Sequence, residues 1–283
     1  MTLNFEIVAL VLFSALLHAS WNAMGKDSGD RLALSAVLYG TMALAALAAA
    51  ANVAPPALAS WPFLALSVVL HNLYFPILLL TYRDGDLRQV YPIARGTAPP
   101  LVAVLSTAIA GDRLGAGQWL AVGLISAGVL SLALDRRTLG RGTAGSILFA
   151  LMTGVLIGLT TFVDALGLRV AESVFGYIFW LQALSGPPFV GLVVVLGRLR
   201  PKRISIRLCG RGTLAGLLAA VSTSALLWAL SLGAMAPVAA LRETSVIFAA
   251  VVGALILGEP FGRRRIAAAA VVAAGVVLLN LPP

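Results

Sequence analysis

Ten apolar runs follow one another along the chain, and most have about the 20 residues with which a single helix crosses a lipid bilayer. Segments rich in charged residues, glycine or proline separate them. The runs predict helices at residues 4–25, 31–51, 61–82, 87–110, 118–134, 144–166, 172–196, 213–232, 237–257 and 266–281. Their residues do not alternate between apolar and polar, as the strands of a transmembrane barrel would.

The composition agrees with this pattern. Hydrophobic residues make up 60% of the sequence and the mean hydropathy is +0.99, whereas soluble domains use roughly 45–50% apolar residues. Residues 1–4 contain no lysine or arginine, so the first apolar run lacks the charged start of a signal peptide and is expected to remain as a helix. We therefore predict an all-α integral membrane protein with ten transmembrane helices.

A shift of 147 residues aligns the second half of the chain with the first without a gap. Arg95 then falls on Arg242 and Thr97 on Thr244. Further matches are Gly111-Asp112 with Gly258-Glu259, and Ala127-Gly128-Val129 with Ala274-Gly275-Val276. We interpret residues 1–135 and 136–283 as two copies of one five-helix unit. Because five is odd, the second copy enters the membrane upside down, which gives two inverted five-helix repeats.

Basic residues are distributed unequally between the two sets of loops. Of the 20 lysines and arginines, sixteen lie in loops after odd-numbered helices, whereas only Arg113 and Arg169 lie on the opposite face. Positively charged loops stay in the cytoplasm, so both termini are predicted on the outer side and the connection 197–212 inside. This topology explains the net charge of +9. We expect contact with membrane lipid and no nucleic-acid partner.

Two helices in corresponding positions carry prolines inside their apolar runs. Pro92, Pro99 and Pro100 are expected to break the helix at 87–110, and Pro237 opens the helix at 237–257. Interrupted helices at matching positions of inverted repeats are typical of secondary transporters, whose substrate site lies near the midplane between the halves.

Small residues at helical spacing predict two places where helix backbones approach closely. These are the pairs Gly154 with Gly158, and Gly212 with Gly216.

Each repeat carries a Gly-Asp or Gly-Glu turn, at Gly111-Asp112 and Gly258-Glu259, followed by a helix with Ala-Gly-Val near its end. The first helix adds the sequence His18-Ala19-Ser20-Trp21-Asn22-Ala23. Over essentially its whole length the chain resembles the EamA-type transporters of the drug/metabolite transporter superfamily. The resemblance implies a multi-pass protein of the bacterial inner membrane, without a cofactor, that exports neutral or aromatic amino acids or related small metabolites by alternating access.

The chain departs from the four-helix multidrug members of that superfamily, which rely on one membrane glutamate in their first helix. Its first helix has only Glu6, near the outer end. A polyspecific cation pump of that kind is therefore not favoured.

Polar and aromatic side chains inside the predicted helices form a candidate substrate cavity. Ser14, His18, Trp21 and Asn22, for example, share one face of the first helix. The candidate residues are His18, Trp21, Asn22, His71, Asn72, Tyr74, Tyr91, Arg95, Trp180, Gln182, Ser224, Trp228, Arg242 and Glu243. For most of them, hydrogen bonding or packing between helices stays open as an alternative. A lining of indoles and phenols with little net charge favours a zwitterionic amino acid with a largely apolar side chain.

Charged residues within the predicted helices have a structural and a functional interpretation. A guanidinium at Arg95 costs about 2.5–3.5 kcal/mol on insertion scales unless water or an anion meets it. Either it extends to the nearby interface, or with Tyr91 it meets the substrate carboxylate or a gating acid, with Arg242 in a comparable role toward the outer side. Arg242 and Glu243 point about 100° apart, so each is expected to find a partner on another helix. Glu243 and Asp164 are either structural ion-pair partners or sites for a coupling proton.

Other functional classes are less well supported by the residues. With two histidines, one cysteine and no His-Glu-x-x-His motif, no reactive or metal site is expected, so the chain is not predicted to be an enzyme. A channel, or a flippase for a lipid-linked or amphiphilic metabolite, stays open as an alternative. One chain contains both halves, so a monomer is sufficient, and an oligomer is not excluded.

Overall fold

The computed structural model describes residues 4–26, 30–84, 87–134, 144–197, 205–249, 251 and 262–280. Within these ranges the regular elements are all helices. They are α1 (Phe5–Lys26), α2 (Arg31–Ala50), α3 (Trp61–Asp84), α4 (Leu87–Ala108), α5 (Ala116–Ser131), α6 (Ala144–Arg169), α7 (Val174–Val195), α8 (Ile206–Leu232), α9 (Met235–Arg242) and α11 (Arg263–Asn280), with 3-10 turns η1 (Leu58–Ser60) and η2 (Leu132–Leu134). The predicted all-α class is confirmed for these ranges.

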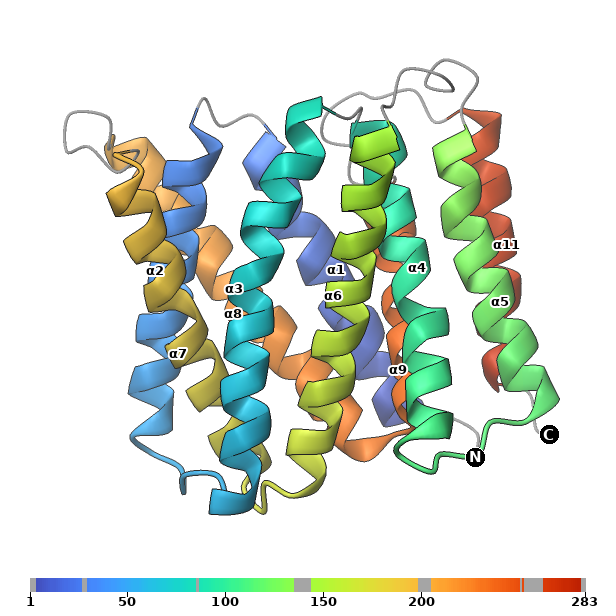
Figure 1. Ribbon diagram of the computed structural model, residues 1–283, viewed down its shortest axis with the longest axis horizontal. Helices are drawn as coiled ribbons and strands as arrows, with labels where there is room; N and C mark the ends of the chain where they lie inside the picture. The colour runs from blue at the N-terminus through green and yellow to red at the C-terminus, as the bar shows by residue number, and fades with distance from the viewer. Residues whose placement is uncertain are drawn as a thin grey trace.

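The helices run alongside one another between the two ends of the molecule (Figure 1). Among the described helices, six are long and apolar enough to cross a membrane: α1, α2, α5 extended by η2, α6, α7 and α8. α1 begins and α11 ends at the same end of the bundle, the lower one in Figure 1.

Side-chain caps fix the starts of three helices. Asp30 accepts a hydrogen bond from the backbone N–H of Ala33 at the start of α2, and Ser173 caps α7 in the same way. Ser205 caps α8, which therefore begins at residue 206 and not at 213 as predicted. The prediction was wrong because Arg207 and Arg211 were assigned to a polar loop, whereas they lie on a helical turn that extends beyond the apolar run.

Close helix packing occurs at the two glycine pairs that the sequence singled out. A Cβ at Gly154 of α6 would lie 2.6 Å from the carbonyl oxygen of Ala94 on α4. One at Gly216 of α8 would lie 2.6 Å from the carbonyl oxygen of Leu38 on α2. Only a residue without a side chain fits at either place, so the predicted close approaches are confirmed.

A further close contact joins α5 and α11. A Cβ at Gly128 would lie 3.2 Å from the carbonyl oxygen of Ala268, and one at Gly275 would lie 3.1 Å from that of Ala121. Gly128 and Gly275 correspond to each other under the 147-residue shift. Each glycine therefore packs against the helix that carries the other one.

The prolines of α4 do not break it. α4 is continuous from Leu87 to Ala108 and contains Pro92, Pro99 and Pro100. The expectation of a break at these residues is therefore wrong. Proline is tolerated inside a helix whose neighbours support the backbone. Here α6 packs closely on the same segment through Gly154, as described above, and α5 approaches Gly96, where a Cβ would lie 2.6 Å from the Leu130 side chain.

The corresponding helix of the second half is interrupted. α9 ends at Arg242, the chain makes a turn at Glu243 and Thr244, and residues 245–249 are helical again. Pro237 lies in the first turn of α9, where its missing N–H has no role in the helix. The interruption is therefore located at Glu243, not at the proline.

At the lower end of the bundle, Gly111 has a φ of +72° and begins the predicted Gly-Asp turn. Asp112 in this turn forms an ion pair with Arg169 at the end of α6, with 2.6 Å between Oδ1 and Nη2. The matching turn at Gly258-Glu259 lies outside the described residues.

Candidate functional site

A buried ion pair links α4 to the interruption after α9. Arg95 is 5% exposed and Glu243 2% exposed, and 3.1 Å separates Nε of Arg95 from Oε2 of Glu243. Nη2 of Arg95 also donates a hydrogen bond of 2.8 Å to Oγ of Ser245. Glu243 thus finds its partner on another helix, as expected. We call Arg95, Arg242, Glu243 and Ser245 the central cluster.

The interruption of the ninth helix supplies these partners. The backbone N–H groups of Glu243 and Thr244 bond to the carbonyl groups of Ala240 and Leu241, three residues back, which tightens the chain into a turn. The Thr244 hydroxyl donates to the same Leu241 carbonyl at 2.8 Å. The turn brings Glu243 and Ser245 to Arg95, and sequence reasoning missed Ser245 because it expected an unbroken helix there.

Arg242 belongs to the same cluster. It interacts electrostatically with Arg95, Glu243, Tyr74 and Tyr91. Its Nε is buried and has no hydrogen-bond partner among the described residues. The two arginines therefore share one cluster and do not lie at opposite ends of a cavity.

Aromatic side chains surround the central cluster. His18 and Tyr74 lie within electrostatic range of both arginines. The His18 ring packs edge-on against Trp21 with 4.9 Å between ring centroids, and the indole N–H of Trp21 is buried without a hydrogen-bond partner among the described residues. Tyr39 on α2 interacts with Tyr74 and Arg242. Sequence reasoning missed Tyr39, although a tyrosine inside an apolar run was a signal.

The predicted site residues Asn22 and Asn72 donate hydrogen bonds to backbone carbonyl groups. Asn22 donates to the carbonyl oxygen of His18 at 2.9 Å. Asn72 donates to the carbonyl oxygen of Val68 at 2.9 Å and, more weakly, to that of Ser185 on α7 at 3.4 Å. Only the contact of Asn72 with Ser185 is the bonding between helices that the sequence left open as an alternative.

The structure does not bring all the predicted aromatic residues together. Trp180 lies near the start of α7 beside Trp61, with 5.7 Å between ring centroids, and Trp228 lies near the end of α8 beside Phe175, at 5.4 Å. Trp21 lies near the end of α1, in the opposite half of the bundle. The indoles therefore form two groups.

Gln182 and Ser224 make a polar contact between α7 and α8. Nε2 of Gln182 donates to Oγ of Ser224 at 3.0 Å. Oε1 of Gln182 is buried without a hydrogen-bond partner among the described residues.

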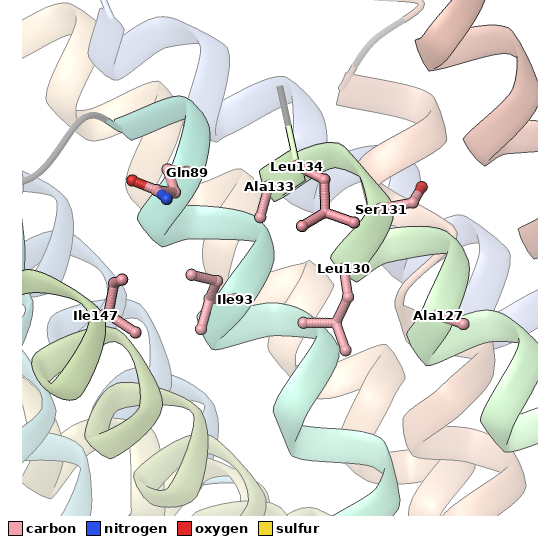
Figure 2. Close-up of a pocket in the computed structure, with 8 residues that line it drawn as sticks. All are labelled: Gln89, Ile93, Ala127, Leu130, Ser131, Ala133, Leu134 and Ile147. Carbon is pink, nitrogen blue, oxygen red and sulfur yellow. The ribbon is translucent and has the colours of Figure 1, made fainter. Parts of the chain in front are cut away.

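A pocket of about 480 Å³ opens between α4, the end of α5 with η2, and the start of α6 (Figure 2). Its lining consists of Gln89, Ile93, Ala127, Leu130, Ser131, Ala133, Leu134 and Ile147. The lining is largely apolar, and no predicted site residue belongs to it. Oε1 of Gln89 is buried without a hydrogen-bond partner among the described residues.

The central cluster is suited to binding a charged group. It combines two guanidinium groups and one carboxylate in an apolar surrounding, where such charges interact strongly. The donors of Arg242 and Trp21 noted above are available to an acceptor. Among the residues that the structure describes, no three His, Cys, Asp or Glu side chains are arranged to hold a metal ion.

No protein-family model and no curated protein matches the chain. Among solved structures, a crystal structure of a protein matches with a TM-score of 0.76 at 12% sequence identity. The match covers 96% of this chain and 95% of that chain. At this identity the similarity shows a shared fold along nearly the full length of both chains.

Proposed function

We propose that the chain is a membrane carrier with ten transmembrane helices in two inverted repeats, residues 1–135 and 136–283. The contact between α5 and α11 through Gly128 and Gly275 supports this arrangement, because matching helices of inverted repeats meet at the axis that relates them. The meeting of α4 with the interrupted ninth helix supports it in the same way.

The proposed function is export of amino acids with largely apolar side chains, or of related small metabolites, across the bacterial inner membrane by alternating access. The observation that carries it is the buried Arg95–Glu243 ion pair at an interrupted helix, beside Arg242 with its unused donor. A buried ion pair adds little stability compared with apolar packing, so its presence at a helix interruption favours a functional role.

Each charged residue then has a role. Arg242 binds the substrate carboxylate, for which a guanidinium offers two parallel N–H groups. Arg95 and Glu243 act as a gate that closes when they pair. Tyr74, Tyr91 and the His18–Trp21 pair provide the apolar and aromatic surface for the substrate side chain.

The test is transport by the purified protein in proteoliposomes loaded with unlabelled amino acid. We expect labelled phenylalanine, methionine or threonine to exchange into these vesicles. The exposed Arg113→Gln variant is the matched control and should keep this activity, whereas Arg242→Gln should lose it. Vesicles that move quaternary ammonium cations and ignore all three amino acids would overturn the proposal.

A second candidate is a flippase for an amphiphilic metabolite. The apolar pocket between α4, α5 and α6 favours it, because its lining suits an acyl chain. A dithionite assay with fluorescent lipid in the same vesicles distinguishes the two functions.

A further inference from the structure

A second acidic residue, Asp164, lies buried on α6 and is not a member of the Arg95–Glu243 ion pair. It is 3% exposed, and its Oδ1 accepts a hydrogen bond of 3.2 Å from the hydroxyl of Tyr177 on α7, which is fully buried. A Cβ at Gly167 would lie 2.5 Å from this hydroxyl, so the glycine makes room for the tyrosine. The buried Ser67 hydroxyl of α3 is close enough to interact with the carboxyl group. The arrangement holds Asp164 in one orientation.

Asp164 differs from Glu243 and Asp112, each of which pairs with an arginine. No lysine or arginine among the described residues forms an ion pair with it. A buried carboxylate without a paired cation is costly, so it needs a proton or a cation from outside the protein.

Ionisable groups face Asp164 from three of the neighbouring helices. They are His71 on α3, Tyr177 on α7 and Arg242 on α9. On α4, Arg95 and Tyr91 act on Arg242. The described ionisable residues of α8, Arg207, Cys209 and Arg211, lie in its first two turns, at the opposite end of the bundle.

Arg242 and Asp164 are therefore two side chains of opposite charge that do not form an ion pair with each other. One is a guanidinium with an unused donor and the other is a carboxyl group without an ion-pair partner, and the two attract each other electrostatically without forming an ion pair. A free amino acid carries a carboxylate and an ammonium group, which are complementary to these two side chains.

We propose that Asp164 binds the ammonium group of the substrate and, when the substrate is absent, a proton. This inference rests on the proposed export function and deepens it. The carboxylate of Asp164 takes a proton from the outer side, toward which its end of α6 is directed, and releases it to the cytoplasm, where an incoming ammonium group takes its place. Proton and substrate are thus carried in opposite directions.

His71 contacts Ser67, which also interacts with the Asp164 carboxyl group. Its Nδ1 lies 3.2 Å from Oγ and 3.0 Å from the carbonyl oxygen of Ser67, one turn earlier on α3. The imidazole also interacts electrostatically with the Asp164 carboxyl group.

The first test compares phenylalanine with 3-phenylpropanoate, which lacks the ammonium group. The wild-type protein should bind phenylalanine at least tenfold more tightly, whereas Asp164→Asn, which keeps the bond from Tyr177, should lose most of this preference. Equal binding of both ligands by the wild-type protein would overturn the inference, even if Asp164→Asn failed to fold.

The second test measures protons directly. Phenylalanine added to wild-type protein in weakly buffered detergent should release protons, and a pH gradient across proteoliposomes should drive its accumulation. Asp164→Asn should release none and should exchange phenylalanine only without accumulation, while Asp164→Glu should keep gradient dependence. A gradient response in Asp164→Asn equal to that of the wild type would overturn the inference. Absence of any amino-acid transport by the wild type would instead refute the proposed function.

Discussion

Arg95 and Glu243 depend on each other because each is buried and charged. Removing one partner leaves the other charge without its ion-pair partner, whereas replacing both removes both charges of the pair and leaves Arg242. The pair can therefore be tested for two separate roles, in stability and in transport.

We expect Arg95→Gln and Glu243→Gln each to destabilise the protein by about 3–5 kcal/mol, since each leaves an uncompensated buried charge. The double variant should recover only part of this loss, because Arg242 then lacks the carboxylate of Glu243, and it should not transport. Thermal unfolding followed by size-exclusion chromatography measures the first effect and vesicle exchange the second. A double variant with full transport would show that the pair is only structural.

The Arg95→Lys variant tests whether Arg95 acts only through its positive charge or needs the N–H groups of a guanidinium. A lysine ammonium keeps the charge but cannot contact Glu243 and Ser245 with two differently placed N–H groups. We expect a folded protein with strongly reduced exchange. Near-normal exchange by Arg95→Lys would indicate that Arg95 needs only its charge, as an interfacial anchor would.

At the scale of the helix, spacing predicted contacts well and interruptions poorly. The glycine pairs beginning at Gly154 and Gly212 were found because a small residue at helical spacing marks a close approach whatever the neighbour is. The break at Glu243 was missed, and so was the ion pair of Glu243, whose partner Arg95 lies 148 residues earlier in the chain and meets it only after folding.

A pair of glycine substitutions tests the packing of α6 on α4. Alanine normally stabilises a helix interior by up to about 1 kcal/mol relative to glycine. At Gly154 a Cβ would meet the Ala94 carbonyl oxygen, so Gly154→Ala should instead destabilise by about 1–3 kcal/mol. Gly123 on α5 has open space around it, so Gly123→Ala is the control. Thermal unfolding that shows the same shift for both would contradict the packing.

At the scale of the whole molecule, the sequence predicted the helical class and nearly all helix positions. The one candidate cavity that it predicted is different, because the structure does not bring all of its residues together. Helical periodicity places His18 and Trp21 on one face, but it gives no depth in the bundle relative to Trp180 or Trp228. The depth of a residue in the bundle depends on how all the helices are arranged relative to one another, and the periodicity of one helix does not give this arrangement. The candidate residues consequently separate into two groups: the central cluster with His18 and Trp21 near it, and Trp180 and Trp228 toward the end of the bundle at which α1 begins.

The distribution of charge over the two ends of the bundle gives the last prediction. Most exposed arginines of the described residues, among them Arg31, Arg207 and Arg263, lie at the end opposite to the start of α1. The other end has Arg113 and Arg169, and Arg169 pairs with Asp112. Since positively charged ends remain in the cytoplasm, both termini should face the outer side. Alkaline phosphatase fused after Pro283 should be active, and a fluorescent protein fused there should be dark. Fusions in the connection between α7 and α8 should behave in the opposite way, which controls for expression. Fluorescence from the C-terminal fusion would show the opposite orientation, in which Asp164 lies toward the cytoplasm. Proton entry to Asp164 from the outer side would then have to be abandoned.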